Sequence, residues 1–371
     1  MSKFILEIDN RFSHFGDRNA EYAGSVVKAL ASSKYGVSDI MEVLKKRENT
    51  KHNIKGLISS MDARVVSVEE LAPNIVEIAI HAPLAAKNFE PGQFYKLQNY
   101  ETFSKKMDDV AFTIEPIAVT GASVDNDQGI VNVILLQNGA SSKLTSYLTP
   151  GEPVVLMGPT GSPTTIPDHC KKVLLVGGGL GNAVLFSIGQ KFKGAGVAVS
   201  YFAAYKNKKS IFKVDEIQKA ANHITWVCEE ELDDAFLIGD TDRFVKGNII
   251  DALSRYSDEL RQYDHMIVIG SDKMMSAVAK FRFHDCKSYF NAQSFAIASI
   301  NSPMQCMMQG VCGQCVQVEK NILTGEDKVI FSCMNQDQNM EYVDFQCLQT
   351  RLSKNTLQEK INSAWLTTLL D

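Results

Sequence analysis

A run of glycines directly after a continuous apolar stretch constrains the fold of this chain most strongly. Residues 173–176 are all apolar, which is typical of a strand buried on both faces of a parallel sheet. The run Gly177-Gly178-Gly179-Leu180-Gly181-Asn182 follows at once, and a segment with helical spacing comes next. A strand, a glycine turn and a helix start form a phosphate site, because backbone N–H groups and the positive helix end face the ligand. A tight turn without a ligand is the plainer alternative.

Three more segments repeat this pattern, residues 197–202, 224–227 and 265–270. Their alternation with helical segments predicts a nucleotide-binding α/β domain with a parallel sheet over residues 168–297. Lys206, Lys208 and Lys209 follow the second strand. They favour contact with the 2′-phosphate of NADPH over NADH, and a lysine-rich surface loop explains them equally well.

Short strands separated by Pro and Gly come before this domain. They cover residues 64–68, 75–80, 94–97, 130–136 and 154–157. This density of strands and turn signals predicts a small antiparallel barrel over residues 61–167. Residues 1–60 have helical spacing without strand patterning, which predicts a helical extension or docking arm.

Four cysteines cluster near the C-terminus: Cys306, Cys312, Cys315 and Cys333. Cys312 and Cys315 are two residues apart, and Gly310 and Gly313 let the backbone curl so that amide N–H groups face sulfur. Four thiolates fit a 2Fe-2S cluster or a tetrahedral zinc ion, and ordinary buried thiols are the alternative.

We place the cysteine segment at residues 298–345. A C-terminal helix over residues 346–371 is predicted to carry an apolar stripe, formed by Leu352, Leu357, Ile361, Trp365 and Leu369. Cys347 is the substitute fourth ligand if Cys306 does not bind.

Composition excludes several classes of protein. The net charge is −5 and no basic stripe is present, so nucleic acid is not an expected partner. No apolar stretch is long enough to cross a bilayer, and the first residues lack the apolar run of a leader peptide. With eight cysteines, these features predict a cytoplasmic protein whose clustered thiols hold metal.

In this order, the motifs resemble the ferredoxin reductase superfamily, and most closely its iron–sulfur flavoprotein branch. That branch includes the electron-transfer subunit of dihydroorotate dehydrogenase and the small subunit of ferredoxin–NADP oxidoreductases. The resemblance covers residues 61–340 and rests mainly on the glycine turn and the Cys312/Cys315 pair. It implies FAD in the barrel, NAD(P)H on the α/β domain and a 2Fe-2S cluster on the tail. The phrases around residues 115–121 and 335–338 also look like modules joined to a flavoprotein similar to the glutamate synthase small subunit.

The resemblance also implies roles for particular residues. Those expected along the flavin are Pro116, Ile117, Ala118 and Val119. Those expected at its pyrophosphate are Gly139, Ser141 and Ser142. Those expected at the nicotinamide nucleotide are Gly177, Gly179, Gly181 and Asn182. No catalytic acid or base is implied, because the family's task is electron transfer.

The chain departs from the family pattern at three places. Glu115 stands where the family usually has Arg beside the flavin phosphate. Residues 269–272 (Ile-Gly-Ser-Asp) replace the usual Cys-Gly-Pro beside the nicotinamide. Cys306 lies one residue further from the Cys312/Cys315 pair than the usual first ligand.

Two functions therefore stand as hypotheses. The first is an oxidoreductase subunit that passes electrons between NAD(P)H, a flavin and a 2Fe-2S cluster, to or from a redox partner. That partner would resemble the glutamate synthase small subunit or the catalytic subunit of dihydroorotate dehydrogenase. A flavin suits the central place because it exchanges two electrons with a nicotinamide and one with a cluster. The second is a non-redox structural or regulatory subunit, with a zinc-stapled tail and a degenerate flavin fold.

Overall fold

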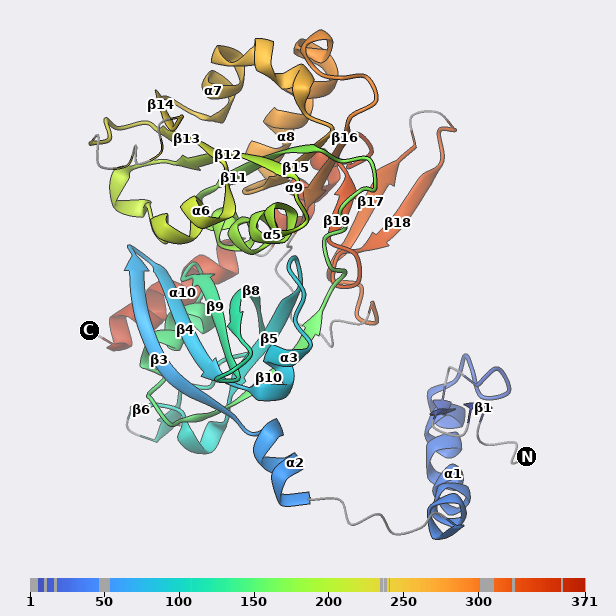
Figure 1. The fold of residues 1–371 in the computed structure, drawn as a ribbon. Helices are drawn as coiled ribbons and strands as arrows, with labels where there is room; N and C mark the ends of the chain where they lie inside the picture. Colours follow the sequence, from blue (N-terminus) through green and yellow to red (C-terminus); the bar gives the residue numbers. More distant parts are fainter. Residues whose placement is uncertain are drawn as a thin grey trace. The chain divides into compact units, whose positions relative to one another are not determined.

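The computed structural model divides the chain into two units, Met1–Leu57 and Ile58–Asp371 (Figure 1). The residues that it describes are 6–9, 12–16, 19–46, 54–107, 109–233, 236, 239, 241–300, 310–321, 324–354 and 356–370.

The first unit combines a short hairpin with one long helix. β1 (Leu6–Asp9) pairs antiparallel with β2 (Phe12–His14), and α1 spans Val26–Lys46. The N–H of Gly16 donates to Ser32 Oγ at 3.2 Å, which ties the segment after the hairpin to α1. The helix was predicted, but the expected absence of strands was wrong. Residues 6–9 alternate apolar and acidic side chains, which is a strand pattern.

The second unit begins with α2 (Ile54–Met61), which starts just before the unit boundary, and a closed barrel of six strands in the order β10-β3-β4-β9-β8-β5. The strands are β3 (Ala63–Ala72), β4 (Ile75–His81), β5 (Phe94–Asn99), β8 (Ile117–Asp125), β9 (Ile130–Leu136) and β10 (Pro153–Thr160). Their neighbours are all antiparallel, and inward residues such as Ile78, Leu97 and Val133 are fully buried. The predicted barrel is confirmed.

Short elements lie between the barrel strands along the chain. They are α3 (Pro83–Lys87), β6 (Lys106–Met107), β7 (Val110–Ala111) and α4 (Ala140–Leu144). β8 is a barrel strand that the sequence patterns did not predict, and Gly121 interrupts its apolar pattern.

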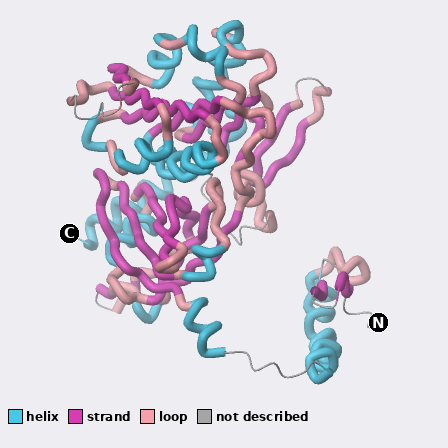
Figure 2. Tube along the Cα trace, in the orientation of Figure 1, coloured by secondary structure: helices cyan, strands magenta, loops and turns pink. Residues whose placement is uncertain are grey.

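The second part of this unit is a sheet of seven strands in the order β14-β13-β12-β11-β15-β16-β19. Figure 2 shows the strands of the unit in magenta and its helices in cyan. Its strands are β11 (Lys172–Gly178), β12 (Ala198–Tyr205), β13 (His223–Cys228), β14 (Arg243–Lys246), β15 (His265–Ile269), β16 (Phe295–Ser299) and β19 (Asp337–Asn339). All neighbours are parallel except β16 and β19, which are antiparallel. The predicted parallel α/β sheet is confirmed, and β19 adds an edge strand from the predicted cysteine segment.

Helices cover both faces of this sheet. α5 (Asn182–Gly194) and α6 (Val214–Ala220) lie on the face toward the barrel, and α7 (Ile249–Arg255) and α8 (Asp272–Lys280) lie on the other (Figure 1). α5 packs in the same apolar cluster as barrel residues Ala122 and Ile134. This cluster therefore joins the barrel to the sheet, while the inside of the barrel has a core of its own.

The C-terminal part forms a hairpin and two helices. β17 (Val316–Lys320) pairs with β18 (Asp327–Phe331), and α9 (Phe345–Ser353) and α10 (Thr356–Leu370) follow. α10 lies against the barrel through Leu366, which is 1% exposed, whereas Leu357 and Trp365 are 70% and 57% exposed. The predicted apolar stripe is only partly a contact face: Leu352 and Leu369 pack against the neighbouring cores, whereas Ile361 is exposed like Leu357 and Trp365. In the described part of the chain, no helix is long and apolar enough to cross a membrane.

His265 at the start of β15 is a buried titratable group in the large sheet. It is 3% exposed, and its ring stacks on the rings of Phe192 and Phe295 at centroid distances of 6.1 and 5.7 Å. Burial lowers the pKa of His265 to about 4, and the hydrogen bond to the Phe295 carbonyl opposes this shift.

We expect His265 to make the fold sensitive to acid. Between its ordinary pKa of 6.5 and its folded pKa of about 4, the unfolded chain binds a proton that the folded chain does not. The free energy of unfolding therefore falls as pH falls through this window, by about 3 kcal/mol at full extent. Urea unfolding of the wild type and of His265→Asn, followed by circular dichroism from pH 7 to pH 4, measures the difference. Equal pH slopes in the two proteins would contradict the prediction.

Candidate functional site

A cavity of about 740 Å³ lies at the carboxyl ends of the strands of the large sheet. Gly178, Gly179 and Gly181 form one wall of it, where β11 ends and α5 begins. Gly179 has a φ of +54°, and a Cβ there would meet nothing within 4 Å. The glycine therefore allows a left-handed backbone and leaves bare main chain facing the cavity.

Gly181 is required by packing. A Cβ at this position would collide with the carbonyl oxygen of Ile269 on β15. The start of α5 therefore lies close against β15, and its first N–H groups lie at the cavity wall. This is the arrangement in which a helix N-terminus binds phosphate.

Two predicted nucleotide-binding residues lie behind the turn. The Asn182 side chain is 0% exposed; its Nδ2 donates to Gly179 O at 3.0 Å and its Oδ1 accepts from the Tyr201 hydroxyl at 3.1 Å. Asn182 also occupies the space that a Cβ on Gly177 would need. Burial raises the pKa of Tyr201 well above its ordinary value, so this hydroxyl remains a donor at neutral pH. Asn182 and Gly177 thus brace the turn, whereas Gly178, which the motif analysis omitted, faces the cavity.

The ends of other parallel strands form the remaining walls. Lys206 follows β12, Glu229 follows β13, and Ser271 and Asp272 follow β15. Of the three lysines predicted to meet a 2′-phosphate, only Lys206 lines the cavity. Ligands of open parallel sheets bind at the carboxyl ends of the strands. These residues could therefore have been predicted from their positions after the strands, whereas their residue types alone did not indicate a site.

The barrel and the C-terminal helices close the cavity. Thr120, Leu136 and Asn138 come from the barrel, and Leu348 and Leu352 come from α9. A ligand in this cavity would therefore contact the parallel sheet and the barrel together.

The residues predicted to lie along a flavin are at the start of β8 and just before it. Pro116, Ile117 and Ala118 are half-buried, whereas Val119 points into the barrel core and is 2% exposed. Ala118 pairs with Lys96 of β5. The half-buried start of β8 presents an apolar face that fits a planar ring.

The turn predicted for the flavin pyrophosphate starts α4. The N–H of Gly139 donates to Ser142 Oγ at 3.0 Å, and Ser141 Oγ accepts from the N–H of Glu115 at 3.3 Å. A Cβ on Gly139 would lie 2.5 Å from Glu359 Oε2 of α10. The hydroxyls suit a phosphate, but the carboxylates of Glu115 and Glu359 oppose its charge. Glu359 reaches this place with the far end of a flexible side chain, so it can turn away.

The β17–β18 hairpin brings two of the predicted metal ligands together. Cys315 precedes β17 and Cys333 follows β18; both are 0% exposed and share a small apolar cluster with Phe94. Gly310, at a φ of +70°, donates its N–H to Cys333 Sγ at 3.1 Å. Buried thiols with amide N–H donors have the chemistry that fits an iron–sulfur cluster.

The full ligand set stays a prediction. Cys312 is exposed, and Cys306 lies outside the described residues. Among the residues that the structure describes, no three His, Cys, Asp or Glu side chains gather closely enough to hold a metal ion.

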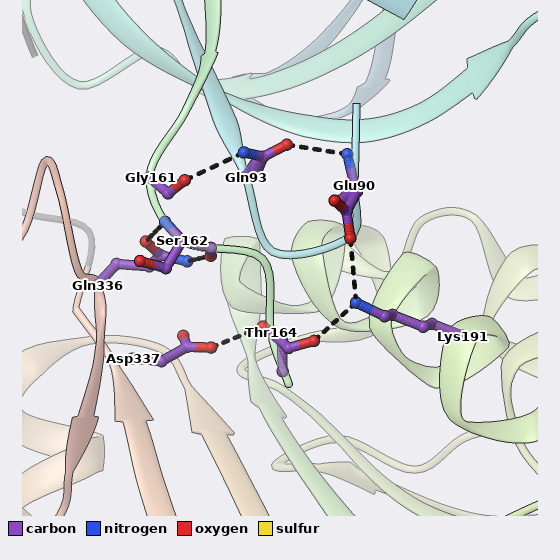
Figure 3. A network of polar contacts seen from close by, with 8 residues as sticks. All are labelled: Glu90, Gln93, Gly161, Ser162, Thr164, Lys191, Gln336 and Asp337. Atoms are coloured by element: carbon purple, nitrogen blue, oxygen red, sulfur yellow. Dashed lines mark hydrogen bonds and ion pairs between the residues drawn. The ribbon is translucent and has the colours of Figure 1, made fainter. Parts of the chain in front are cut away.

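A polar network that sequence reasoning missed lies where the barrel, the sheet and the cysteine segment meet (Figure 3). Thr164 Oγ1 donates to Asp337 Oδ2 at 2.7 Å, and Lys191 Nζ of α5 donates to Thr164 O at 2.9 Å. Lys191 also lies 3.6 Å from Glu90 Oε2 of the barrel. Burial raises the pKa of Asp337, while the Thr164 hydroxyl acts in the opposite direction. The alternating hydroxyls of residues 160–164 were the signal in the sequence.

A closed antiparallel barrel followed by a parallel sheet, with a glycine turn facing the barrel, defines a fold of the ferredoxin reductase type. A solved structure with this fold, from work on the NADH-dependent reduced ferredoxin-NADP oxidoreductase, superimposes with a TM-score of 0.64 at 22% identity. The match covers 82% of this chain and 97% of that one. The predicted resemblance to the ferredoxin reductase superfamily is confirmed at the level of the fold.

Sequence relatives agree with this class, although no family model matches the chain. An uncharacterized protein of Rickettsia prowazekii is 32% identical over 363 residues, which are 95% of this chain and 41% of that protein. The chain thus spans about two fifths of that relative. A Thermotoga maritima homolog of the dihydroorotate dehydrogenase B electron transfer subunit is 26% identical, covering 80% of this chain and 93% of that one. The corresponding subunit of Bacillus cereus is 25% identical over 68% of this chain and 86% of its own length.

Proposed function

We propose that this chain is an electron-transfer oxidoreductase subunit, passing electrons between NAD(P)H, FAD and a 2Fe-2S cluster. The observation that supports this proposal most strongly is the position of β8. Ala118 on this strand packs against the cluster of Phe94, Cys315 and Cys333, and Thr120, two residues further, lines the nucleotide cavity. One strand therefore connects the two sites between which a flavin would act.

The proposal assigns candidate residues to each cofactor. Gly178, Gly179 and Gly181 would hold the nucleotide, Pro116 to Val119 the flavin ring, and the turn at Gly139 its phosphates. Cys312, Cys315 and Cys333, with Cys306, would hold the cluster. A bound flavin would exchange two electrons with the nucleotide and one at a time with the cluster.

A partner protein belongs to this proposal. Relatives are named as electron transfer subunits of dihydroorotate dehydrogenase B, and the Rickettsia relative extends well beyond the matched region. We infer a redox partner similar either to a glutamate synthase small subunit or to a dihydroorotate dehydrogenase catalytic subunit. We also infer a cytoplasmic setting, because clustered cysteines in a reducing compartment hold metal more often than disulfides.

The first test quantifies iron, zinc and flavin in anaerobically purified protein, and adds a variant. Cys315→Ser should lose the visible absorption of the cluster and most of the iron, because a buried thiolate ligand is removed. The sheet should remain folded by circular dichroism. Cys286→Ser, which changes a thiol outside the cysteine segment, is the matched control. Unchanged iron in Cys315→Ser would refute the ligand assignment.

The same sample tests the second function. The carboxylates of Glu115 and Glu359 at the expected phosphate turn favour a degenerate flavin site and hence a zinc-stapled docking subunit. Stoichiometric zinc in a colourless protein without flavin would establish that function and end the redox proposal.

We expect Glu359→Gln to strengthen FAD binding. The change removes a negative charge beside the expected pyrophosphate position and keeps the shape of the side chain. An increase of about threefold to tenfold in affinity corresponds to weakening one partly screened charge repulsion. Flavin fluorescence titration of the deflavinated protein measures it. Glu326→Gln, in the exposed turn between β17 and β18, controls for the change in net charge. Equal affinity of both variants would contradict the prediction.

We also expect Lys206 to select the nucleotide. If Lys206 pairs with a 2′-phosphate, Lys206→Ala should weaken NADPH binding by about tenfold and leave NADH binding nearly unchanged. Lys209→Ala, which removes an exposed lysine outside the cavity, should affect neither. Isothermal titration with both nucleotides distinguishes the cases, and equal losses for NADH and NADPH would show that Lys206 does not contact a 2′-phosphate.

A further inference from the structure

The segment after Cys333 is hydrogen-bonded to the end of β10 and to the linker of residues 161–171, which connects the barrel to the large sheet. Three alternate residues, of which Thr160 ends β10 and the other two lie in the linker, carry hydroxyls that donate to this segment. Thr160 Oγ1 donates to Cys333 O at 3.5 Å, Ser162 Oγ to Met334 O at 2.8 Å, and Thr164 Oγ1 to Asp337 Oδ2 at 2.7 Å. Residues later in the first segment bond to residues later in the second, so the three contacts fix the register of the two segments relative to each other.

Gln336 lies at the centre of this junction (Figure 3). Its side chain is 0% exposed, and its Oε1 accepts from the N–H of Ser162 at 3.0 Å. Its Nε2 donates to Gly92 O at 2.9 Å and also to Ser162 O. Both hydrogens of the amide are used, and its oxygen accepts one bond. The side chain therefore holds the barrel turn at Gly92 and the linker at Ser162 together.

Gln338, two residues further, shows that burial alone does not explain this arrangement. It is 1% exposed in β19, and neither atom of its amide has a hydrogen-bond partner among the described residues. The same residue type is thus fully paired at one position and unpaired at the other. The two residues provide a matched comparison, with Gln336 just before β19 and Gln338 within it.

We propose that Gln336 is a positioning residue that sets Cys333 against the flavin-facing strand of the barrel. Cys333 precedes Gln336 by three residues and packs with Phe94, and Phe94 belongs to β5, the neighbour of β8. The Gly92 carbonyl that Gln336 holds lies two residues before Phe94. One amide therefore anchors both sides of the contact between the cysteines and the barrel. This inference rests on the proposed function.

The first experiment needs no bound metal. Gln336→Met keeps the length of the side chain and removes its three hydrogen bonds. In full-length protein freed of metal by chelation, we expect alkylation of Cys333 to become about tenfold faster. Loss of buried hydrogen bonds shifts a local opening equilibrium by roughly that factor. Peptide mass spectrometry follows each thiol, and Cys228, 0% exposed in the large sheet, is the internal reference.

The second experiment uses the loaded protein. Stopped-flow mixing with NADPH or NADH separates flavin reduction from later cluster reduction, and electron paramagnetic resonance during a redox titration gives the potential and signature of the cluster. Gln336→Met should slow cluster reduction by about an order of magnitude, as small displacements of reacting groups do, and leave flavin reduction unchanged. The cluster signature should shift as well. A purely structural role would slow both steps alike.

Two further variants complete the design. Gln338→Met should change none of these quantities, because no hydrogen bond is lost. Ser162→Ala removes the hydroxyl bond to Met334 O and keeps the backbone contacts with Gln336, so it should act in the same direction as Gln336→Met but more weakly. If Gln336→Met does not fold, Ser162→Ala still tests the positioning role.

Failure of the positioning role of Gln336 and failure of the proposed electron-transfer function give different results. A wild-type protein that carries cluster and flavin, with unchanged Cys333 reactivity, cluster signature and rates in Gln336→Met and Ser162→Ala, overturns the positioning role alone. Equal effects of Gln336→Met and Gln338→Met overturn it too. A wild-type protein without iron overturns the proposed function, and the positioning role with it.

Discussion

The second unit depends on the packing of one helix between its two parts. α5 starts at the glycine turn, and its apolar side chains share one cluster with Ala72, Ala122 and Ile134 of the barrel. Apolar burial is the main favourable term in folding, so the barrel and the sheet cannot separate without exposing this core. The distance between β8 and the glycine turn is therefore set by packing. Lys191, near the end of α5, extends the attachment to the linker through Thr164.

Local patterns in the sequence predicted the elements whose apolar residues follow a regular spacing. Continuous apolar runs such as residues 173–176 became central strands, because such runs have one stable environment in a parallel sheet. β8 and β19 were missed for the opposite reason. Gly121 and Thr120 weaken the apolar pattern of β8, and β19 consists of Asp337, Gln338 and Asn339, which form a strand only because β16 offers a free edge.

Some parts of the candidate site were predictable from the sequence, and others were not. The glycine turn was predictable because its strand, its glycines and its helix are neighbours in the sequence, although the positions of Asn182 and Gly178 required the fold. The approach of Glu359 to Gly139 has no local signal, since the two residues meet only through the packing of α10 on the barrel. Its charge matters for the same reason as that of Glu115, because both carboxylates lie near the turn proposed to hold the flavin phosphates.

The junction beside the cysteines is polar, and its chemistry suits a contact whose register matters. Apolar side chains tolerate sliding, because their attraction has little directionality. A buried amide that uses both of its hydrogens tolerates almost none, since each lost bond leaves a buried group unpaired at a cost of about 1–3 kcal/mol. Gln338 has no such bonds, and its backbone is held instead by β16. Directional contact is thus concentrated at Gln336, where the cysteine segment, the linker and the barrel turn at Gly92 meet, and this is the point at which a shift of register would move Cys333 relative to β8.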